Sequence, residues 1–131
     1  MKIIFAILLF SSSMNLLAQQ TTDAQAKELY NNLTICQLYY TDKFMAAMGQ
    51  YGANQPSKER DHAMEMMEFF EERVIKLLMV NGPHPGNEVN SEIWHDVVGQ
   101  KGVKKIMKGF TDSQIGQLPA LCGELRNKIE K

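Results

Sequence analysis

Three residues in the middle of the chain have types and a spacing that could bind a metal ion. Glu65 and Met66 follow His62 by three and four residues, so on a helix all three project from neighbouring positions. Proteins use such spacings for metal ligands, and an imidazole with a soft thioether suits Cu(I). We therefore keep copper handling as an alternative function, with His62, Glu65 and Met66 as the ligands.

The chain is also rich in methionine, which could extend a copper site. Nine of its 131 residues are methionine, and six of these fall within the first two expected helices: Met45, Met48, Met64, Met66, Met67 and Met79. Methionine also fills irregular helical cores, and these residues scatter around the helices instead of forming one stripe. Core packing is the interpretation we favour, and we expect no cofactor.

The remaining polar residues form no recognisable catalytic set. His95 and Asp96 are adjacent, so on a helix they point about 100° apart and cannot form a direct pair. The sequence contains no Gly-x-Ser-x-Gly, no His-Glu-x-x-His and no phosphate-binding glycine loop. An acidic stripe on the second expected helix is expected to be solvated; its members are Asp61, Glu65, Glu68 and Glu72. We therefore do not expect an enzyme.

The two cysteines, Cys36 and Cys122, lie far apart in the chain. Two cysteines in an exported protein most simply form one disulfide. Such a bond would join the first helix to the last, and chain ends fray unless they are tied down. It would also remove the two thiols as nucleophiles, because only a free thiolate reacts.

Four lysines near the C-terminal third share one helical face. Lys101, Lys104, Lys105 and Lys108 follow an i, i+3, i+4, i+7 pattern with no acidic residue between them. Such a stripe makes a local positive patch. It could contact an acidic partner, anionic lipid headgroups or the molecule's own acidic stripe, or it could be solvated. The short length and the neighbouring glycines argue against the lipid interpretation.

The first 18 residues have the layout of a secretory signal peptide. Lys2 precedes the apolar run from Ile3 to Phe10, and the small residue Ala18 follows. This run is too short for a membrane span, which needs about 20 residues. We expect cleavage near Ala18, a periplasmic or extracellular location, and no transmembrane segment in the mature protein, residues 19–131.

The mature part is acidic rather than basic. The whole chain has 14 basic and 15 acidic side chains. Removing Lys2 leaves 13 against 15, a net charge of −2. Domains that bind nucleic acids are usually strongly basic, so we expect no nucleic-acid partner.

Apolar periodicity predicts helices throughout residues 19–131. A first helix begins after the Thr21–Asp23 cap and ends near Gly52. Ser57 caps a second helix, which continues to about Val80. Its expected buried stripe consists of Ala63, Met67, Phe70, Val74, Leu77 and Leu78.

The C-terminal half is predicted to hold shorter helices. A stiff loop with His84 at its tip follows the second helix, and Asn90 or Ser91 caps the next one. Glycines at 99 and 102 predict a break or a bend before a short helix at roughly residues 103–108. Thr111 and Gln114 form a capping box for the last helix. Pro119 should kink that helix or restart it. The fold class is therefore all-α: a small bundle of four to six helices in a single domain, stapled by the disulfide.

The first helix has apolar residues on two sides. Leu33, Cys36 and Tyr40 share one arc, whereas Ile35, Leu38, Tyr39 and Met45 lie on the other. A helix that is apolar nearly all round is central or faces a partner. We name the second set as candidate partner contacts, together with His84 and the four lysines Lys101, Lys104, Lys105 and Lys108.

These features indicate an exported, non-enzymatic protein-binding module of the inhibitor or immunity type. A signal peptide, a helical domain and a disulfide together resemble the layout of small periplasmic helical immunity proteins that neutralise secreted cell-wall amidases. The resemblance is in architecture and size, so it implies a protein partner without assigning residues. The partner would be another protein or a second copy of the chain. Copper handling and carriage of a small apolar ligand are the alternatives.

Overall fold

The computed structural model describes residues 23–81 and 88–130, and no strand occurs in these two ranges. The expected signal peptide and the His84 loop lie outside them. The described elements, in order, are α2 (Asp23–Tyr51), α3 (Lys58–Asn81), α4 (Glu88–Trp94), η2 (His95–Gly99), α5 (Gln100–Lys108) and α6 (Asp112–Glu130). The all-α prediction is confirmed. In this part of the chain, no helix is long and apolar enough to cross a membrane.

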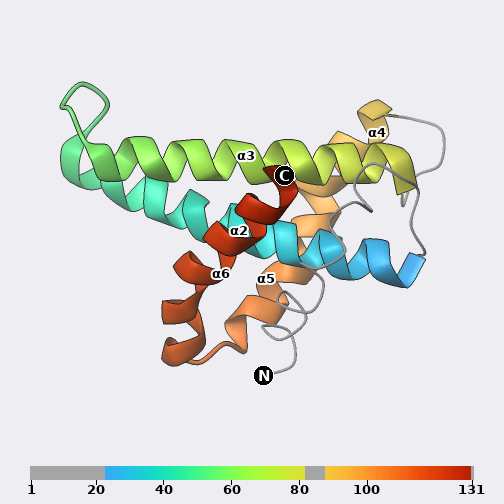
Figure 1. The fold of residues 1–131 in the computed structure, drawn as a ribbon. Coiled ribbons are helices and arrows are strands. Elements are labelled where there is room, and N and C mark those ends of the chain that lie inside the picture. The colour runs from blue at the N-terminus through green and yellow to red at the C-terminus, as the bar shows by residue number, and fades with distance from the viewer. Residues whose placement is uncertain (1–22, 82–87, 131) are drawn as a thin grey trace.

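The two longest helices, α2 and α3, lie side by side and run antiparallel (Figure 1). Gly52 ends α2 with a positive φ of 72°, a conformation that glycine adopts without steric cost. The Ser57 hydroxyl caps α3 by accepting the Arg60 N–H at 3.1 Å. The Arg60 guanidinium donates to the Gly52 and Gln55 carbonyls at 2.7 and 2.6 Å, which ties the connection together.

Helix α3 buries a stripe close to the predicted one. The buried residues are Ala63, Met66, Phe70, Val74, Leu77 and Leu78. Met66 replaces the expected Met67, which is half-buried. The reason is register: steps of three, four and four residues from Ala63 lead to Met66, Phe70 and Val74 on one face.

Helices α4, η2 and α5 form one continuous rod from Glu88 to Lys108, which we call the α4–α5 rod. It begins before the expected caps, Asn90 or Ser91, and of the break or bend predicted near Gly99 and Gly102 no break occurs. A π-helical segment, η2, takes its place. The Gln100 N–H accordingly bonds the His95 carbonyl, five residues back.

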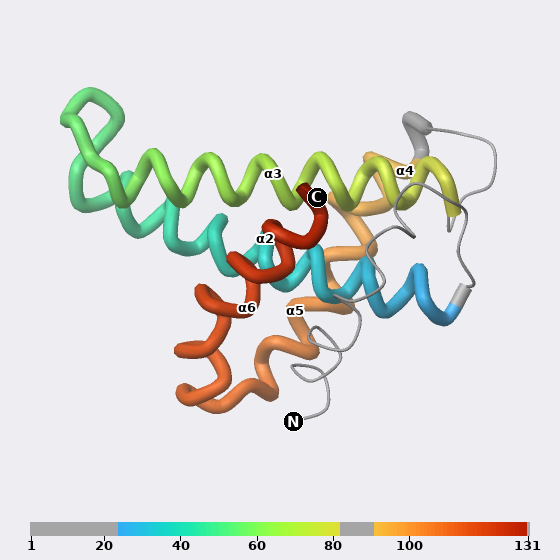
Figure 2. Tube along the Cα trace, viewed as in Figure 1, coloured from blue at the N-terminus to red at the C-terminus, as the bar shows by residue number. Residues whose placement is uncertain are grey.

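Helix α6 begins as predicted and runs through its proline. The Thr111 N–H donates to Gln114 Oε1 at 2.8 Å, and the Gln114 N–H donates to Thr111 Oγ1 at 3.2 Å, so the capping box is confirmed. Pro119 lies within the helix and lacks the N–H that would continue the ladder. Figure 2 shows α6 bending partway along its length.

Helix α2 is the centre of the molecule. It packs against α3, α5 and α6, and every residue from 32 to 38 is buried. The predicted disulfide is present: Cys36 and Cys122 join α2 to α6 with an S–S length of 2.09 Å, and neither residue is exposed.

Covering of α2 corrects one expectation about its second face. Ile35, which we had named as a partner contact, lies in the core with an exposed fraction of 0%, whereas Leu38 keeps 7% of its surface exposed and lines the groove described below. Tyr39 is half-buried, with the Lys43 ammonium 5.4 Å from its ring centre. Met45 stays exposed. The physical reason is that α6 and the rod pack where the sequence showed no obvious cover.

Replacing Cys36 with serine should lower the free energy of unfolding by about 2–5 kcal/mol, the range found when a native disulfide is removed from a small secreted domain. The variant loses the cross-link and places a hydroxyl where no solvent reaches. Urea denaturation followed by circular dichroism measures the loss, with reduced wild-type protein as the comparison. Alkylation in denaturant without reductant should label neither wild-type cysteine; labelling of both would contradict the bond.

Candidate binding groove

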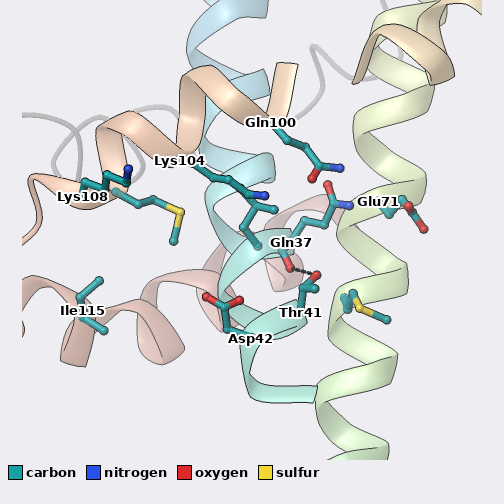
Figure 3. Close-up of a pocket in the computed structure, with 11 residues that line it drawn as sticks. Gln37, Thr41, Asp42, Glu71, Gln100, Lys104, Lys108 and Ile115 are labelled. Atoms are coloured by element: carbon teal, nitrogen blue, oxygen red, sulfur yellow. Dashed lines mark hydrogen bonds between the residues drawn. The ribbon is translucent and has the colours of Figure 1, made fainter. Parts of the chain in front are cut away.

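A groove of about 600 Å³ opens between α2, α3, α5 and the first turn of α6 (Figure 3). Its lining mixes apolar, amide, hydroxyl and charged side chains: Gln37, Leu38, Thr41, Asp42, Met67, Glu71, Gln100, Lys104, Met107, Lys108 and Ile115. This volume lies within the range of pockets that hold ligands, about 300–1,000 Å³. The groove is therefore the candidate functional site.

Charges of both signs line the groove without neutralising each other. Asp42 extends from α2, and Lys104 and Lys108 extend from α5. Within residues 23–81 and 88–130, none of these three side chains makes an ion pair. Figure 3 shows the Glu71 carboxylate pointing away from the other lining residues. The groove can therefore meet a ligand with one anionic side chain and two ammonium groups.

A buried histidine lies behind the groove wall. His95 has no exposed surface; its Nε2 is 2.7 Å from Gln37 Oε1 and its Nδ1 is 2.8 Å from the Tyr30 hydroxyl. The Gln37 oxygen can only accept, so Nε2 carries the hydrogen and Nδ1 accepts from Tyr30. Gln37 also lines the groove. The histidine therefore sets how this amide is presented to a ligand.

Both titratable members of this network are neutral near pH 7. Burial lowers the pKa of His95 below its ordinary value of 6.5, and the Asp96 carboxylate only partly opposes this. Burial raises the pKa of Tyr30 to about 12. All hydrogen-bonding atoms of the imidazole are satisfied within the fold. The network is therefore a structural bridge between α2 and η2.

Gly99 lets the rod approach this bridge. A Cβ at Gly99 would overlap the Tyr30 hydroxyl and lie 2.7 Å from the Trp94 ring. The rings of Tyr30 and Trp94 pack with centroids 5.7 Å apart. Only a residue without a side chain fits here, which explains a glycine inside a helical rod. The π turn that contains it begins at His95.

The lysine stripe divides into two rows. Lys104 and Lys108 line the groove, whereas Lys101 and Lys105 do not. All four are exposed, and none makes an ion pair with another described residue. The sequence therefore identified two groove residues, but it did not separate them from their neighbours.

The three residues named as copper ligands have other partners. Arg126 bonds the Glu65 carboxylate at 2.9 Å and the Met66 sulfur at 3.2 Å. Met66 is buried, and the exposed His62 packs edge-on against Tyr40. The Arg126 guanidinium thus already binds the donor atoms of two of the three residues. Across the described residues, no group of three His, Cys, Asp or Glu side chains is arranged to hold a metal ion.

Sequence reasoning missed the buried bridge. It considered His95 only as a catalytic partner of Asp96, and it did not consider Tyr30 or Gln37. Two signals were present: Tyr30 and Gln37 are seven residues apart, which places them on one helical face. Gly99 follows His95 by four residues inside a helical pattern, where a glycine often marks close packing.

Replacing Gly99 with alanine should destabilise the protein by about 1–3 kcal/mol, because overpacking outweighs the gain in helix propensity. Gly102 has open space around it, so Gly102→Ala should be neutral or stabilise by up to about 1 kcal/mol. Removing the hydroxyl with Tyr30→Phe should make Gly99→Ala less damaging. Equal effects of the two alanines in urea denaturation would contradict the close approach.

Acidification should destabilise the protein through His95. The folded-state pKa lies below 6.5, so the unfolded chain binds the proton more readily, and the stabilisation present above about pH 6.5 is lost as the pH falls. His95→Gln should be less stable at about pH 8 and lose less stability towards about pH 5. Identical slopes for wild-type protein and His95→Gln would contradict the assignment.

Comparisons with known protein families, with curated proteins and with solved structures find no match to this chain. The geometry of the groove and of the bridge behind it therefore carries the functional argument.

Proposed function

We propose that this protein is an exported, non-enzymatic binding module whose groove receives a segment of a partner polypeptide. The observation that carries the proposal is the lining of the groove. Leu38, Met107 and Ile115 offer apolar contact, while Gln37 and Gln100 offer amides, beside charges that are not neutralised within the described fold. A pocket with an apolar lining and a few placed polar groups is typical of ligand sites.

A polypeptide fits this lining better than a small apolar ligand does. A peptide brings apolar side chains, backbone donors and acceptors, and charges together. A lipid would remove Asp42, Lys104 and Lys108 from water without offering them a partner, which is costly. We therefore do not pursue the apolar carrier. Copper handling is also set aside, because Arg126 already bonds Glu65 and Met66.

Binding is favoured over catalysis by the state of the groove's polar groups. Among the described residues, the imidazole of His95 bonds the groove residue Gln37, and it is fully buried and bonded on both nitrogens. It cannot reach a substrate without breaking these bonds, and a general base must lie within hydrogen-bond reach of the proton it takes. An inhibitor or immunity role is consistent with such a site, since it needs recognition without turnover.

The proposal predicts that peptides selected from a random library on wild-type protein bind through the groove. Asp42→Lys reverses the charge of the groove wall and should weaken these peptides by about tenfold or more. Glu124→Lys makes the same charge change at an exposed position of α6 that does not line the groove. Calorimetry on the three proteins measures the difference.

Two outcomes would contradict the proposal. One is a selection that yields no peptide binding above background. The other is equal weakening by Asp42→Lys and Glu124→Lys, which would reveal a general charge effect. Circular dichroism of both variants confirms that each is folded before the affinities are compared.

A further inference from the structure

The outward face of the α4–α5 rod is unusually apolar for an exposed helix. Ile93, Val97 and Val98 are 55%, 54% and 51% exposed. The opposite face, with His95, Gly99 and Val103, is buried against the rest of the molecule. Contiguous exposed apolar side chains mark interaction surfaces more often than single ones do.

The π turn straightens this outward face. Residues four apart on an α-helix are offset by about 40°, so a row of them winds around the axis. The wider turn of η2 (His95–Gly99) cancels much of this offset. Ile93, Val97 and Lys101 therefore lie close to one straight line along the rod, with Lys105 one turn further. We call these four residues the outer row.

Charge is separated along the same rod. Glu92 and Asp96 are exposed in its first half, and Lys101 and Lys105 are exposed in its second half. Glu92 also lines a shallow hollow with Glu68 and Glu71 of α3, so negative charge gathers at this end. The nearby carboxylates affect the pKa of Glu71. Burial raises this pKa, and the negative charges of Asp96, Glu92 and Glu68 raise it further.

We propose that the outward face of the α4–α5 rod packs antiparallel against the same rod of a second copy, about a two-fold axis near Val97. The antiparallel arrangement places the acidic half of each rod beside the basic half of its partner. Each charge contact then occurs twice, as a two-fold interface requires. The apolar side chain of Val97 lies nearest the axis, where contacts are best shielded from water, and Ile93 lies one turn away from it.

A second copy fits this surface better than other occupants do. An anionic membrane would attract Lys101 and Lys105 but repel Glu92 and Asp96. A partner with charge of one sign would likewise satisfy only one half of the rod. Within the described residues, Lys101 and Lys105 make no ion pair. A second rod in the antiparallel direction offers basic residues to the acidic half of the first rod and acidic residues to its basic half.

The outer row and the groove use different side chains. Lys104 and Lys108 line the groove, whereas Lys101 and Lys105 extend from the outer row. The two surfaces can therefore be tested separately. Val97→Arg should leave peptide binding in the groove intact, and Asp42→Lys should leave self-association intact.

Sedimentation at tens of micromolar should show wild-type protein at twice the mass of the chain. Val97→Arg places two guanidinium groups at the axis and should raise the dissociation constant of the dimer about tenfold or more. Met45→Arg makes a similar change at a more exposed apolar position, 63% exposed, on α2. Met45→Arg should sediment as wild type does.

A charge exchange tests the antiparallel arrangement and does not depend on one variant folding poorly. Lys101→Glu with Lys105→Glu makes both halves of the rod acidic, and Glu92→Lys with Asp96→Lys makes both halves basic. Each double variant alone should be monomeric, because like charges face each other. An equimolar mixture should form a heterodimer, since an acidic rod then faces a basic one.

Several results would overturn the proposal. Wild-type protein that stays monomeric at tens of micromolar would do so, as would equal behaviour of Val97→Arg and Met45→Arg. Double charge variants that dimerise alone as wild type does would also contradict it. Mixed charge variants that remain monomeric, while each is folded by circular dichroism, would exclude the antiparallel arrangement.

Discussion

The hydrogen-bonded bridge through His95 is the interaction on which the rest of the structure depends. It joins η2 to two positions on α2, Tyr30 and Gln37, which lie about two helical turns apart. The buried imidazole has one satisfied donor and one satisfied acceptor. A shift of η2 along α2 would leave these polar atoms unpaired in the core, so few other packing registers are possible. The π turn begins at His95, and the glycine at position 99 lets the rod approach the Tyr30 hydroxyl.

Two different attachments hold elements against α2. The disulfide between Cys36 and Cys122 fixes α6 covalently, and it acts largely by restricting the unfolded chain. The His95 bridge fixes the rod by hydrogen bonds, and it acts by selecting one packing of the folded chain. The groove lies between α2, α3, α5 and the first turn of α6, so the two attachments hold its α5 and α6 sides against α2. A groove that is formed before its ligand arrives avoids much of the entropy loss of binding.

Local chemistry made much of the fold predictable. The ends of α2 and α3, the Ser57 cap, the Thr111–Gln114 capping box and the disulfide each depend on a few neighbouring residues or on simple cysteine counting. Tertiary packing decided the rest. Gly99 was interpreted as a helix breaker, since glycine has low helix propensity, yet the space beside Tyr30 determines its role. For the same reason, the sequence did not predict the groove, because it forms only where packing places Asp42 of α2 and Lys104 of α5 on the same cavity wall.

Ile35 and Leu38 show that packing within the molecule covers apolar residues of α2 that could have met a partner. The sequence left open whether α2 is fully covered or keeps a face for a partner, and both residues are buried. Covering α2 with the rod turns one face of the rod inwards, and its opposite face then carries the exposed Ile93 and Val97. Helix α2, which is apolar nearly all round, is therefore covered by a rod that is itself apolar on two faces. Exposed apolar residues thus cluster on the rod, while on α2 Met45 stays exposed. The separation of the lysines into a groove row and an outer row follows from the same packing, because α5 meets α2 along one edge only.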